Sequence, residues 1–273
     1  MSANHLGSFE RALRIVDAAA DVGADAIKLQ TFTPEQMVDA DTVIQSGPWA
    51  GRKALELYRE AHTPREWHTA LFAHAKARGI VCFSSVFHRD DVDFLETLGC
   101  PMYKIASFEI TDRPLIKHAA ATGKPIIMST GMATSFEILQ AVCDASHGTQ
   151  DMTLLKCTSA YPAPLEDANL ATIPEMAHRN RVKAGLSDHT LGHTAAVVAT
   201  ALGATMIEKH LTLKRSDGGP DAAFSAEPHE FAEMVKACRE ARAALGEVHY
   251  GPVASEESSL PLRRQSGGKR GST

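Results

Sequence analysis

The chain of 273 residues lacks the features that mark membrane proteins, secreted proteins and nucleic-acid-binding proteins. No apolar run approaches the ~20 residues that a membrane-spanning helix needs. Residues 1–8, MSANHLGS, do not have the basic-then-apolar layout of a signal peptide. The net charge is -5 and no basic stripe offsets it, which argues against a nucleic-acid partner. These absences predict a cytoplasmic globular protein without a membrane or nucleic-acid partner.

The chain has few cysteines, and their spacing matches no zinc-binding motif. The five cysteines never form a CxxC pair, and their number is odd; they are Cys82, Cys100, Cys143, Cys157 and Cys238. This usage predicts neither a disulfide framework nor a structural zinc site, and it fits a reducing compartment.

Seven short apolar runs recur along the chain and are separated by longer amphipathic stretches. The runs cover residues 25–30, 80–85, 102–107, 125–130, 152–158, 183–188 and 205–210. Runs of this length without polar alternation favour parallel strands that are buried on both faces. Helical patterns cover residues 9–22, 64–78, 90–98, 113–121, 135–145, 194–202 and 227–245. Two of them open with start signals, at Thr63-Pro64 and at Thr134 with Glu137 nearby.

Alternating strands and helices predict an α/β fold with a parallel sheet. The expected architecture is a (β/α)₈ TIM barrel over residues 1–246, with its first strand missing or vestigial because only seven strands are visible. A doubly wound open sheet is the alternative. Residues 247–273 are rich in Ser, Gly and charge and have no hydrophobic periodicity, so we expect a linker or tail there.

Polar side chains gather at the carboxyl ends of the seven runs, where parallel α/β folds form their active sites. Lys28 and Lys104 lie inside runs, and a buried ammonium is costly unless an anion matches it. Two such lysines with several hydroxyls nearby would make a pocket for phosphate and carboxylate groups. In the alternative interpretation, either lysine pairs with a structural carboxylate such as Glu208.

Two histidines end neighbouring runs, His189 in GLSDHT and His210 in IEKH. Adjacent parallel strands would bring the two imidazoles within reach of one ion. Two histidines completed by water and substrate oxygens suit Mn²⁺ better than a closed structural zinc site. The alternative is two unrelated polar groups, since the chain has 13 histidines. Two stiff loops nearby, around Tyr161 and Asp221, could contact a sugar or merely cover the core.

Several motifs together resemble the sialic acid synthase (N-acetylneuraminate synthase) family, whose members condense phosphoenolpyruvate with an acylamino sugar. In order from residue 4 to residue 221 they are NHLGS, AIKLQ, YKIAS, PIIMSTGM, CTSAYPAP, GLSDHT, EKH and GGPD. Two longer stretches, WAGRKALELYREAHTPREWH at 49–68 and SDGGPDAAFSAEP at 216–228, are most similar to the pseudaminic acid synthase branch.

The resemblance implies a phosphoenolpyruvate-dependent nonulosonic acid synthase, a transferase that forms a C–C bond with a 2,4-diacetamido-2,4,6-trideoxy hexose. It implies catalytic roles for Glu109, His189 and His210, with the two histidines binding a divalent metal ion, Mn²⁺. Residues that would bind phosphoenolpyruvate are Lys28, Ser85, Lys104, Ser107, Ser129, Ser159 and Ser187, and residues that would contact the sugar are Gln30, Tyr161 and Asp221. A homodimer is also implied.

Both ends of the chain depart from the family pattern. The family carries a glutamate on a strand ahead of the NH loop and an antifreeze-like domain at its C-terminus, and neither is found here. The resemblance therefore implies a barrel core shortened at both ends. The alternatives are a synthase for N-acetylneuraminate or legionaminic acid, an aldolase that forms a Schiff base on Lys104 or Lys28, and an inactive fragment that only binds ligand.

Overall fold

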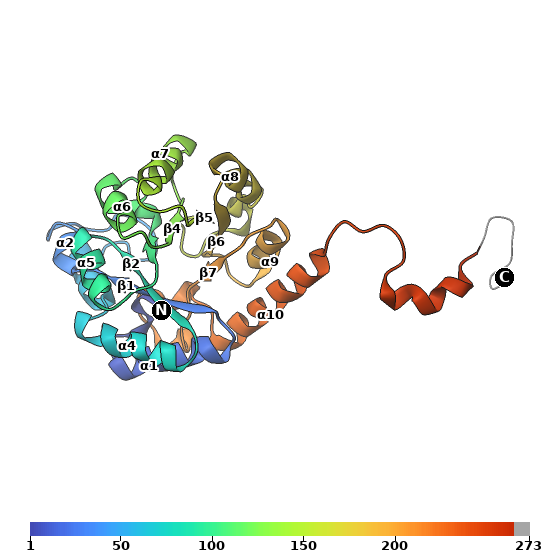
Figure 1. Ribbon diagram of the computed structural model, residues 1–273. Coiled ribbons are helices and arrows are strands. Elements are labelled where there is room, and N and C mark those ends of the chain that lie inside the picture. The colour runs from blue at the N-terminus through green and yellow to red at the C-terminus, as the bar shows by residue number, and fades with distance from the viewer. Residues whose placement is uncertain (265–273) are drawn as a thin grey trace.

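The computed structural model describes residues 1–264 and places seven parallel strands in one curved sheet, a half-barrel surrounded by helices (Figure 1). The strands follow one another in the sheet in the same order as in the sequence. They are β1 (Ala26–Thr31), β2 (Val81–Val86), β3 (Tyr103–Ile105), β4 (Ile126–Ser129), β5 (Met152–Cys157), β6 (Lys183–Asp188) and β7 (Ile207–Lys209). This order excludes the doubly wound alternative, in which the strand order reverses at a switch point.

Helices alternate with the strands, and most of them cover the outer face of the sheet (Figure 1). They are α1 (Phe9–Asp21), α2 (Pro34–Met37), α3 (Ala54–Ala61), α4 (Arg65–Ala77), α5 (Arg89–Thr97), α6 (Arg113–Ala120), α7 (Ser135–Ser146), α8 (Thr172–Asn180), α9 (Thr194–Ala201) and α10 (Pro228–Leu245). Short 3₁₀ segments are η1 (Ser2–His5), η2 (Ser107–Glu109), η3 (Leu165–Ala168), η4 (Arg215–Asp217), η5 (Ala222–Phe224) and η6 (Ala254–Leu262). No helix within residues 1–264 is both long enough and apolar enough to cross a membrane.

Local signals account for most of these elements. All seven expected strands form, and seven of the helices match the expected patterns to within one residue at either end. The capping box expected at the start of α7 is present, with Thr134 and Glu137 each bonded to the other's backbone N–H. At α4 the cap is Pro64, and Thr63 is instead buried without capping the helix. The helices α2, α3 and α8 were not expected from the sequence.

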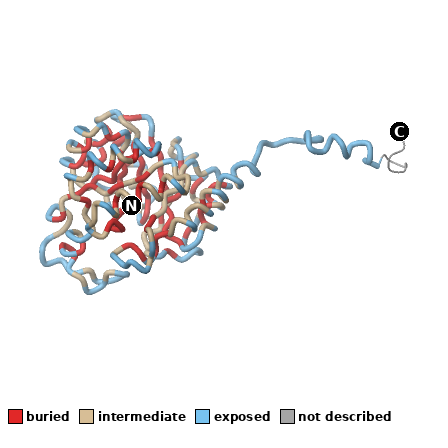
Figure 2. Tube along the Cα trace, turned by 90° about the horizontal axis from the view of Figure 1, so that it is seen from below, coloured by how far each residue is buried: buried red, intermediate tan, exposed pale blue. Residues whose placement is uncertain are grey.

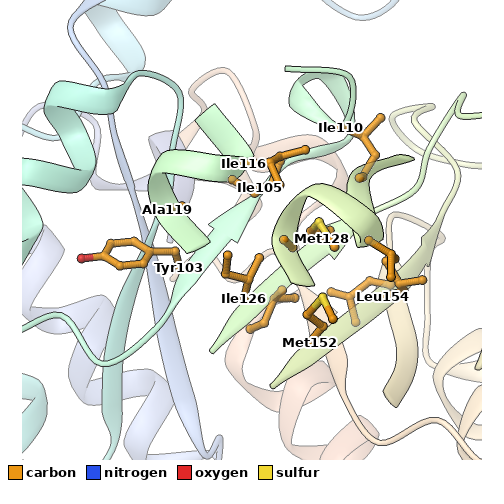
Figure 3. Packing of buried hydrophobic residues seen from close by; sticks show 14 of the residues in the cluster. Tyr103, Ile105, Ile110, Ile116, Ala119, Ile126, Met128, Met152 and Leu154 are labelled. Carbon is orange, nitrogen blue, oxygen red and sulfur yellow. The ribbon is translucent and has the colours of Figure 1, made fainter. Parts of the chain in front are cut away.

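The main hydrophobic core lies between the sheet and its covering helices. Side chains from β3, β4 and β5 interdigitate with those of α6, as Figure 3 shows for Tyr103, Ile105, Ile116, Ala119, Ile126, Met128, Met152 and Leu154. All of these are buried. Full burial of an aliphatic side chain contributes about 1.5–3 kcal/mol, so this layer fixes the strands whose ends carry the polar residues.

The sheet has two outer edges, β1 and β7, which are not hydrogen-bonded to each other. The segment η1 lies next to β1, where the Met1 amino group donates to the Lys28 carbonyl at 2.9 Å. Asn4 donates to the Leu211 carbonyl beyond β7 at 2.9 Å, so residues 1–5 connect the two edges. A cleft of about 720 Å³ remains between them.

The end of the described chain differs from the rest. Helix α10 leads away from the barrel, and residues 247–264 extend from it (Figure 1). Every residue from 247 to 264 is exposed (Figure 2). The remainder of the expected tail, residues 265–273, lies outside the described residues.

Candidate functional site

Strand alternation separates the polar residues at the ends of β6 and β7 into two groups. Ser187 is aligned with Glu208, and Asp188 is aligned with Lys209. Successive side chains on a strand point to opposite faces, so Ser187 and Glu208 share one face and Asp188 and Lys209 share the other. The contacts described below show that Ser187 and Glu208 face the barrel interior.

The imidazoles of His189 and His210 lie side by side immediately after these strands. Their ring centroids are 5.5 Å apart at an interplanar angle of 57°. His189 Nδ1 is 3.0 Å from the Thr158 carbonyl and donates to it, so Nε2 is the ring nitrogen that could bind an ion. His210 Nδ1 is buried without a hydrogen-bond partner and lies 3.9 Å from Asp221 Oδ2. The proximity expected from the sequence is therefore present.

The donor set of this pair suits a cation that also binds water and substrate. Within residues 1–264, no group of three or more His, Cys, Asp or Glu side chains is placed to share one ion. Burial holds the pKa of His210 well below its usual value, so its ring is neutral, which is the form that ligates metals. The unpartnered Nδ1 of His210 is the kind of buried atom that a ligand completes. The two imidazoles thus fit an open metal site and not a closed one.

A second group consists of two lysines around one carboxylate. Lys28 Nζ lies 2.5 Å from Glu208 Oε1, and Lys104 Nζ lies 3.5 Å from the same oxygen. Lys104 also donates to Ser129 Oγ at 2.7 Å, and Ser187 donates to Glu208 Oε1 at 3.3 Å. The alternative that the lysines contact a carboxylate such as Glu208 is therefore correct. Two ammonium groups share one carboxylate, so the group keeps a charge of one positive unit to offer an anion.

Burial and charge act against each other within this group. Burial lowers the pKa of Lys104 to about 8, and the charge of Glu208 partly opposes that shift. Burial would raise the pKa of Glu208, but the charges of Lys104 and Lys28 outweigh it and hold that pKa well below its usual range. Lys104 and Glu208 are therefore charged at neutral pH, and an arriving anion would stabilise the charge of Lys104 further.

Buried polar atoms without partners concentrate at this site. Among the described residues, five buried side-chain atoms have no hydrogen-bond partner, and four of these belong to Ser85, Glu109, Glu208 and His210. Buried polar atoms in native proteins are nearly always hydrogen-bonded, so such a cluster marks a place that is completed by a ligand. Ser85 is aligned with Lys104 on the neighbouring strand, which places its hydroxyl beside the lysine group.

A close approach at Gly131 brings two of the expected serines together. Its backbone N–H donates to Ser107 Oγ at 3.1 Å. A Cβ atom at this position would lie 2.2 Å from Ser159 Oγ and 2.8 Å from Ser107 Oγ, so only glycine fits. The sequence PIIMSTGM therefore supplies Ser129 and also a glycine whose N–H orients the Ser107 hydroxyl.

The carboxyl group of Glu109 is set apart by its pKa. Burial raises that pKa to about 7, and the charge of Lys104 opposes the shift. Its Oε2 is buried without a partner. A carboxyl group poised near neutral pH can both give and accept a proton under working conditions.

Two of the three residues expected to contact the sugar, Tyr161 and Asp221, lie beside the histidine pair, and Ser2 connects the third, Gln30, to Asp221. The Tyr161 ring packs 4.3 Å from the His189 ring. Gln30 Oε1 accepts from Ser2 Oγ at 3.0 Å, and the same hydroxyl contacts Asp221. The cleft between β1 and β7 is bordered by Gln30 and also by Lys28, Glu208 and His210. All of the expected site residues therefore lie at the carboxyl ends of the strands, on one side of the barrel.

The sequence interpretation missed several residues at this site. Glu208 was considered only as a structural partner, although it lies two positions before His210, on the same strand face. Gly131, Trp49 and Phe224 gave no local signal, because a close approach and a contact between distant loops leave no periodic pattern. Cys157, whose Sγ is 3.8 Å from His189 Nδ1, was treated only as an unpaired thiol.

The chain is similar to known proteins along most of its length. Residues 15–250 match the model of the NeuB family. The chain is 44% identical to the pseudaminic acid synthase of Campylobacter jejuni subsp. jejuni over 269 residues, which cover 96% of this chain and 77% of that protein. It is 45% identical to the pseudaminic acid synthase of Helicobacter pylori over 252 residues, which cover 90% of this chain and 74% of that protein.

A solved structure supports the same relationship. The crystal structure of the N-acetylneuraminic acid (sialic acid) synthetase of Leptospira borgpetersenii serovar Hardjo-bovis, in complex with citrate, superposes with a TM-score of 0.86. The superposition covers 94% of this chain and 87% of that chain at 32% sequence identity. The chain belongs to the NeuB family.

Proposed function

We propose that this protein is an enzyme that condenses phosphoenolpyruvate with a 2,4-diacetamido-2,4,6-trideoxy hexose to form a nonulosonic acid and release phosphate, as a pseudaminic acid synthase would. One observation carries the proposal. Lys28 and Lys104 share the single carboxylate of Glu208, and this positively charged group lies next to the adjacent imidazoles of His189 and His210. The higher identity to pseudaminic acid synthases than to the N-acetylneuraminic acid synthetase supports the trideoxy sugar.

The lysine group would bind the phosphate and carboxylate of phosphoenolpyruvate. Lys28 and Lys104 would supply the charge, and hydroxyls would come from Ser85, Ser107, Ser129, Ser159 and Ser187. The Gly131 N–H holds the Ser107 hydroxyl in place. Holding the enol ester in this way places its C3 next to the sugar. Positioning of this kind, together with fixed charges, is the main source of rate enhancement when two substrates must meet.

The reaction forms one C–C bond and one C–O bond and breaks one C–O bond. C3 of the enolpyruvate attacks C1 of the open-chain aldehyde, whose oxygen takes up a proton to become a hydroxyl, and positive charge develops at C2. Water adds at C2 and loses one proton; the phosphate then leaves with its bridging oxygen, and the new hydroxyl at C2 loses its proton to leave a ketone. Glu109, whose pKa is raised by burial to about 7, would stabilise the charge at C2 and accept the proton of that water.

His189 and His210 would hold a divalent metal ion, Mn²⁺. When bound, such an ion polarises a carbonyl oxygen as a Lewis acid, which here would be the sugar aldehyde. Gln30, Tyr161 and Asp221 would orient the sugar relative to it. Mn²⁺ binding is measured directly by electron paramagnetic resonance on the wild type and on His210→Ala. Equal binding by the two proteins would contradict this assignment.

The activity test measures phosphate release from phosphoenolpyruvate with Mn²⁺ and each of three sugars. These are the trideoxy diacetamido hexose, its epimer that leads to legionaminic acid, and N-acetylmannosamine. We expect the highest kcat/KM with the first sugar and loss of activity on chelation. Phosphate release that is independent of every sugar would contradict the proposal, and a preference for another sugar would reassign the substrate.

One observation favours a second chemistry. The pKa of Lys104 is lowered to about 8 by burial, as an amine that forms a Schiff base requires. Lys104 is, however, already bonded to Ser129 and close to Glu208. Borohydride reduction in the presence of a carbonyl substrate, followed by mass spectrometry, distinguishes the two. A stable adduct on Lys104 or Lys28 would support the Schiff base.

The proposed setting is a homodimer in the cytoplasm without a nucleic-acid partner. The homodimer is proposed from the family resemblance. The net charge of -5 supports the lack of a nucleic-acid partner, and the five cysteines, all unpaired, are compatible with a reducing compartment. Light scattering during gel filtration measures the mass in solution. A monomeric mass at micromolar concentration would contradict the dimer.

A further inference from the structure

Three aromatic rings from distant parts of the sequence meet beside the histidine pair. Trp49 packs 5.5 Å from Tyr161 and 6.0 Å from Phe224, and those two rings lie 5.0 Å from each other. Phe224 is also 5.2 Å from the ring of His210. Only 6% of the residues are aromatic, so a cluster of three at the site is a concentration of apolar surface.

Trp49 belongs to the exposed segment between α2 and α3, yet it is fixed to the barrel. Its neighbours Pro48 and Ala50 are exposed, whereas Trp49 itself is half-buried. Its indole N–H donates to the Pro220 carbonyl at 2.9 Å, on the loop that follows β7. The bond satisfies the only polar group of the indole, so the remaining surface of Trp49 is apolar.

The spacing of these rings can be compared with the length of a sugar. The ring centroid of Tyr161 lies 4.3 Å from that of His189 and 5.5 Å from that of Trp49, so the rings of Trp49 and His189 are at most about 10 Å apart. An open-chain hexose is about 6 Å long from C1 to C6, because each C–C bond is about 1.5 Å. If C1 lies beside the two imidazoles and the chain extends toward Trp49, C6 comes within about 4 Å of that ring, which is an apolar contact distance.

We propose that Trp49 determines sugar specificity by forming the apolar end of the sugar subsite, where it contacts the C6 methyl group of a 6-deoxy sugar. The inference rests on the proposed function and adds a residue that selects the substrate. An indole whose N–H is already bonded cannot satisfy a 6-hydroxyl, so a hydroxylated sugar would lose a hydrogen bond to water on binding. A methyl group loses none and gains apolar contact.

The first experiment compares two sugars that differ at one atom. These are the trideoxy diacetamido hexose and the same sugar with a 6-hydroxyl group. A contact the size of one methylene in an apolar pocket changes kcat/KM by about 10–200-fold. We expect Trp49→Ala to lower kcat/KM for the 6-deoxy sugar by at least about 10-fold through KM, and to leave KM for phosphoenolpyruvate unchanged. The preference for the 6-deoxy sugar should fall with it, and Trp49→Phe should retain most of it.

Trp67→Phe is the matched control, because Trp67 is the other tryptophan of the chain and packs against His5 and Phe9, away from Tyr161. The same variant leaves Trp49 as the only tryptophan, so its fluorescence reports on sugar binding without turnover. We expect a saturable change on adding the 6-deoxy sugar in the presence of phosphoenolpyruvate. No change, or a Trp49→Ala variant that loses activity equally on both sugars, would overturn the proposal.

The two proposals can fail separately. Absence of turnover by the wild type with either sugar contradicts the proposed function, and the fluorescence titration then still decides whether sugar binds beside Trp49. Turnover with an unchanged sugar preference in a folded Trp49→Ala variant contradicts only the role of Trp49. Thermal melting of each variant shows whether it is folded.

Discussion

Two lysine–carboxylate groups lie on opposite faces of the sheet at the end of β7, and they differ in how completely their polar atoms are bonded. On the outer face, Lys209 Nζ lies 2.6 Å from Asp188 Oδ2 and donates to the Thr190 carbonyl at 2.6 Å. Asp188 Oδ1 accepts from the Thr190 N–H at 2.9 Å and from its hydroxyl at 2.8 Å. Both carboxylate oxygens therefore have donors, and the side chains of Lys209 and Asp188 are only 4% and 0% exposed.

On the inner face, the same residue types leave atoms unbonded. Glu208 Oε1 is shared by two lysines, while Glu208 Oε2 has no partner. The Ser85 hydroxyl beside the group is likewise unpartnered. A satisfied buried ion pair connects two strand ends, whereas a group with spare charge and spare donors is suited to a ligand. The outer group therefore holds the ends of β6 and β7 together, and the inner group is suited to bind an anion.

The largest expected effect is on stability, from the outer group. We expect Lys209→Met to lower the free energy of unfolding by about 3–5 kcal/mol, because the buried Asp188 carboxylate loses its counter-charge. Urea unfolding followed by circular dichroism measures the change. The double variant Asp188→Leu/Lys209→Met should recover much of the loss, because it leaves no unpaired charge. A loss of unfolding free energy below about 1 kcal/mol in Lys209→Met would contradict this prediction, because exposed surface ion pairs contribute that little.

Replacing a lysine of the inner group should lower activity and leave the free energy of unfolding nearly unchanged. We expect Lys104→Met to lower kcat/KM for phosphoenolpyruvate by about 10²–10³-fold, as removal of one fixed donor to a developing or bound charge does in other enzymes. The free energy of unfolding should change little, because Lys28 still neutralises Glu208. Steady-state kinetics and urea unfolding are measured on the same samples. A large loss of stability with activity retained would reverse the comparison between the two groups.

A smaller effect is expected from pH. The profile of kcat/KM for phosphoenolpyruvate should be bell-shaped, rising as Glu109 loses its proton near its pKa of about 7. It should fall as Lys104 loses its proton above its pKa of about 8, approaching about tenfold per pH unit. Lys104→Arg is the matched variant, because a guanidinium keeps its proton and should move the falling limb to higher pH. If the falling limb of the Lys104→Arg profile stays at the same pH, the titrating group is not Lys104.

Much of the site could be predicted because it repeats a local pattern. Polar residues end each apolar run, and parallel strands bring those ends to one side. His189 and His210 were therefore expected to be neighbours, and their rings lie 5.5 Å apart. Glu208 was visible in the same motif, but whether it serves only the fold or also a ligand depends on which of its oxygens has a partner. Only the three-dimensional structure shows which oxygen has a partner.

The amino-acid sequence by itself determined the seven strands, most of the helices and the end of the sheet at which the polar residues collect, because hydrophobic periodicity and strand alternation are properties of neighbouring residues. Only the tertiary structure decided how far the sheet curls, which buried atoms remain without partners and which loops meet over the histidines. Residues 49, 161 and 224 come together through contacts between segments far apart in the chain, and no local pattern encodes such contacts.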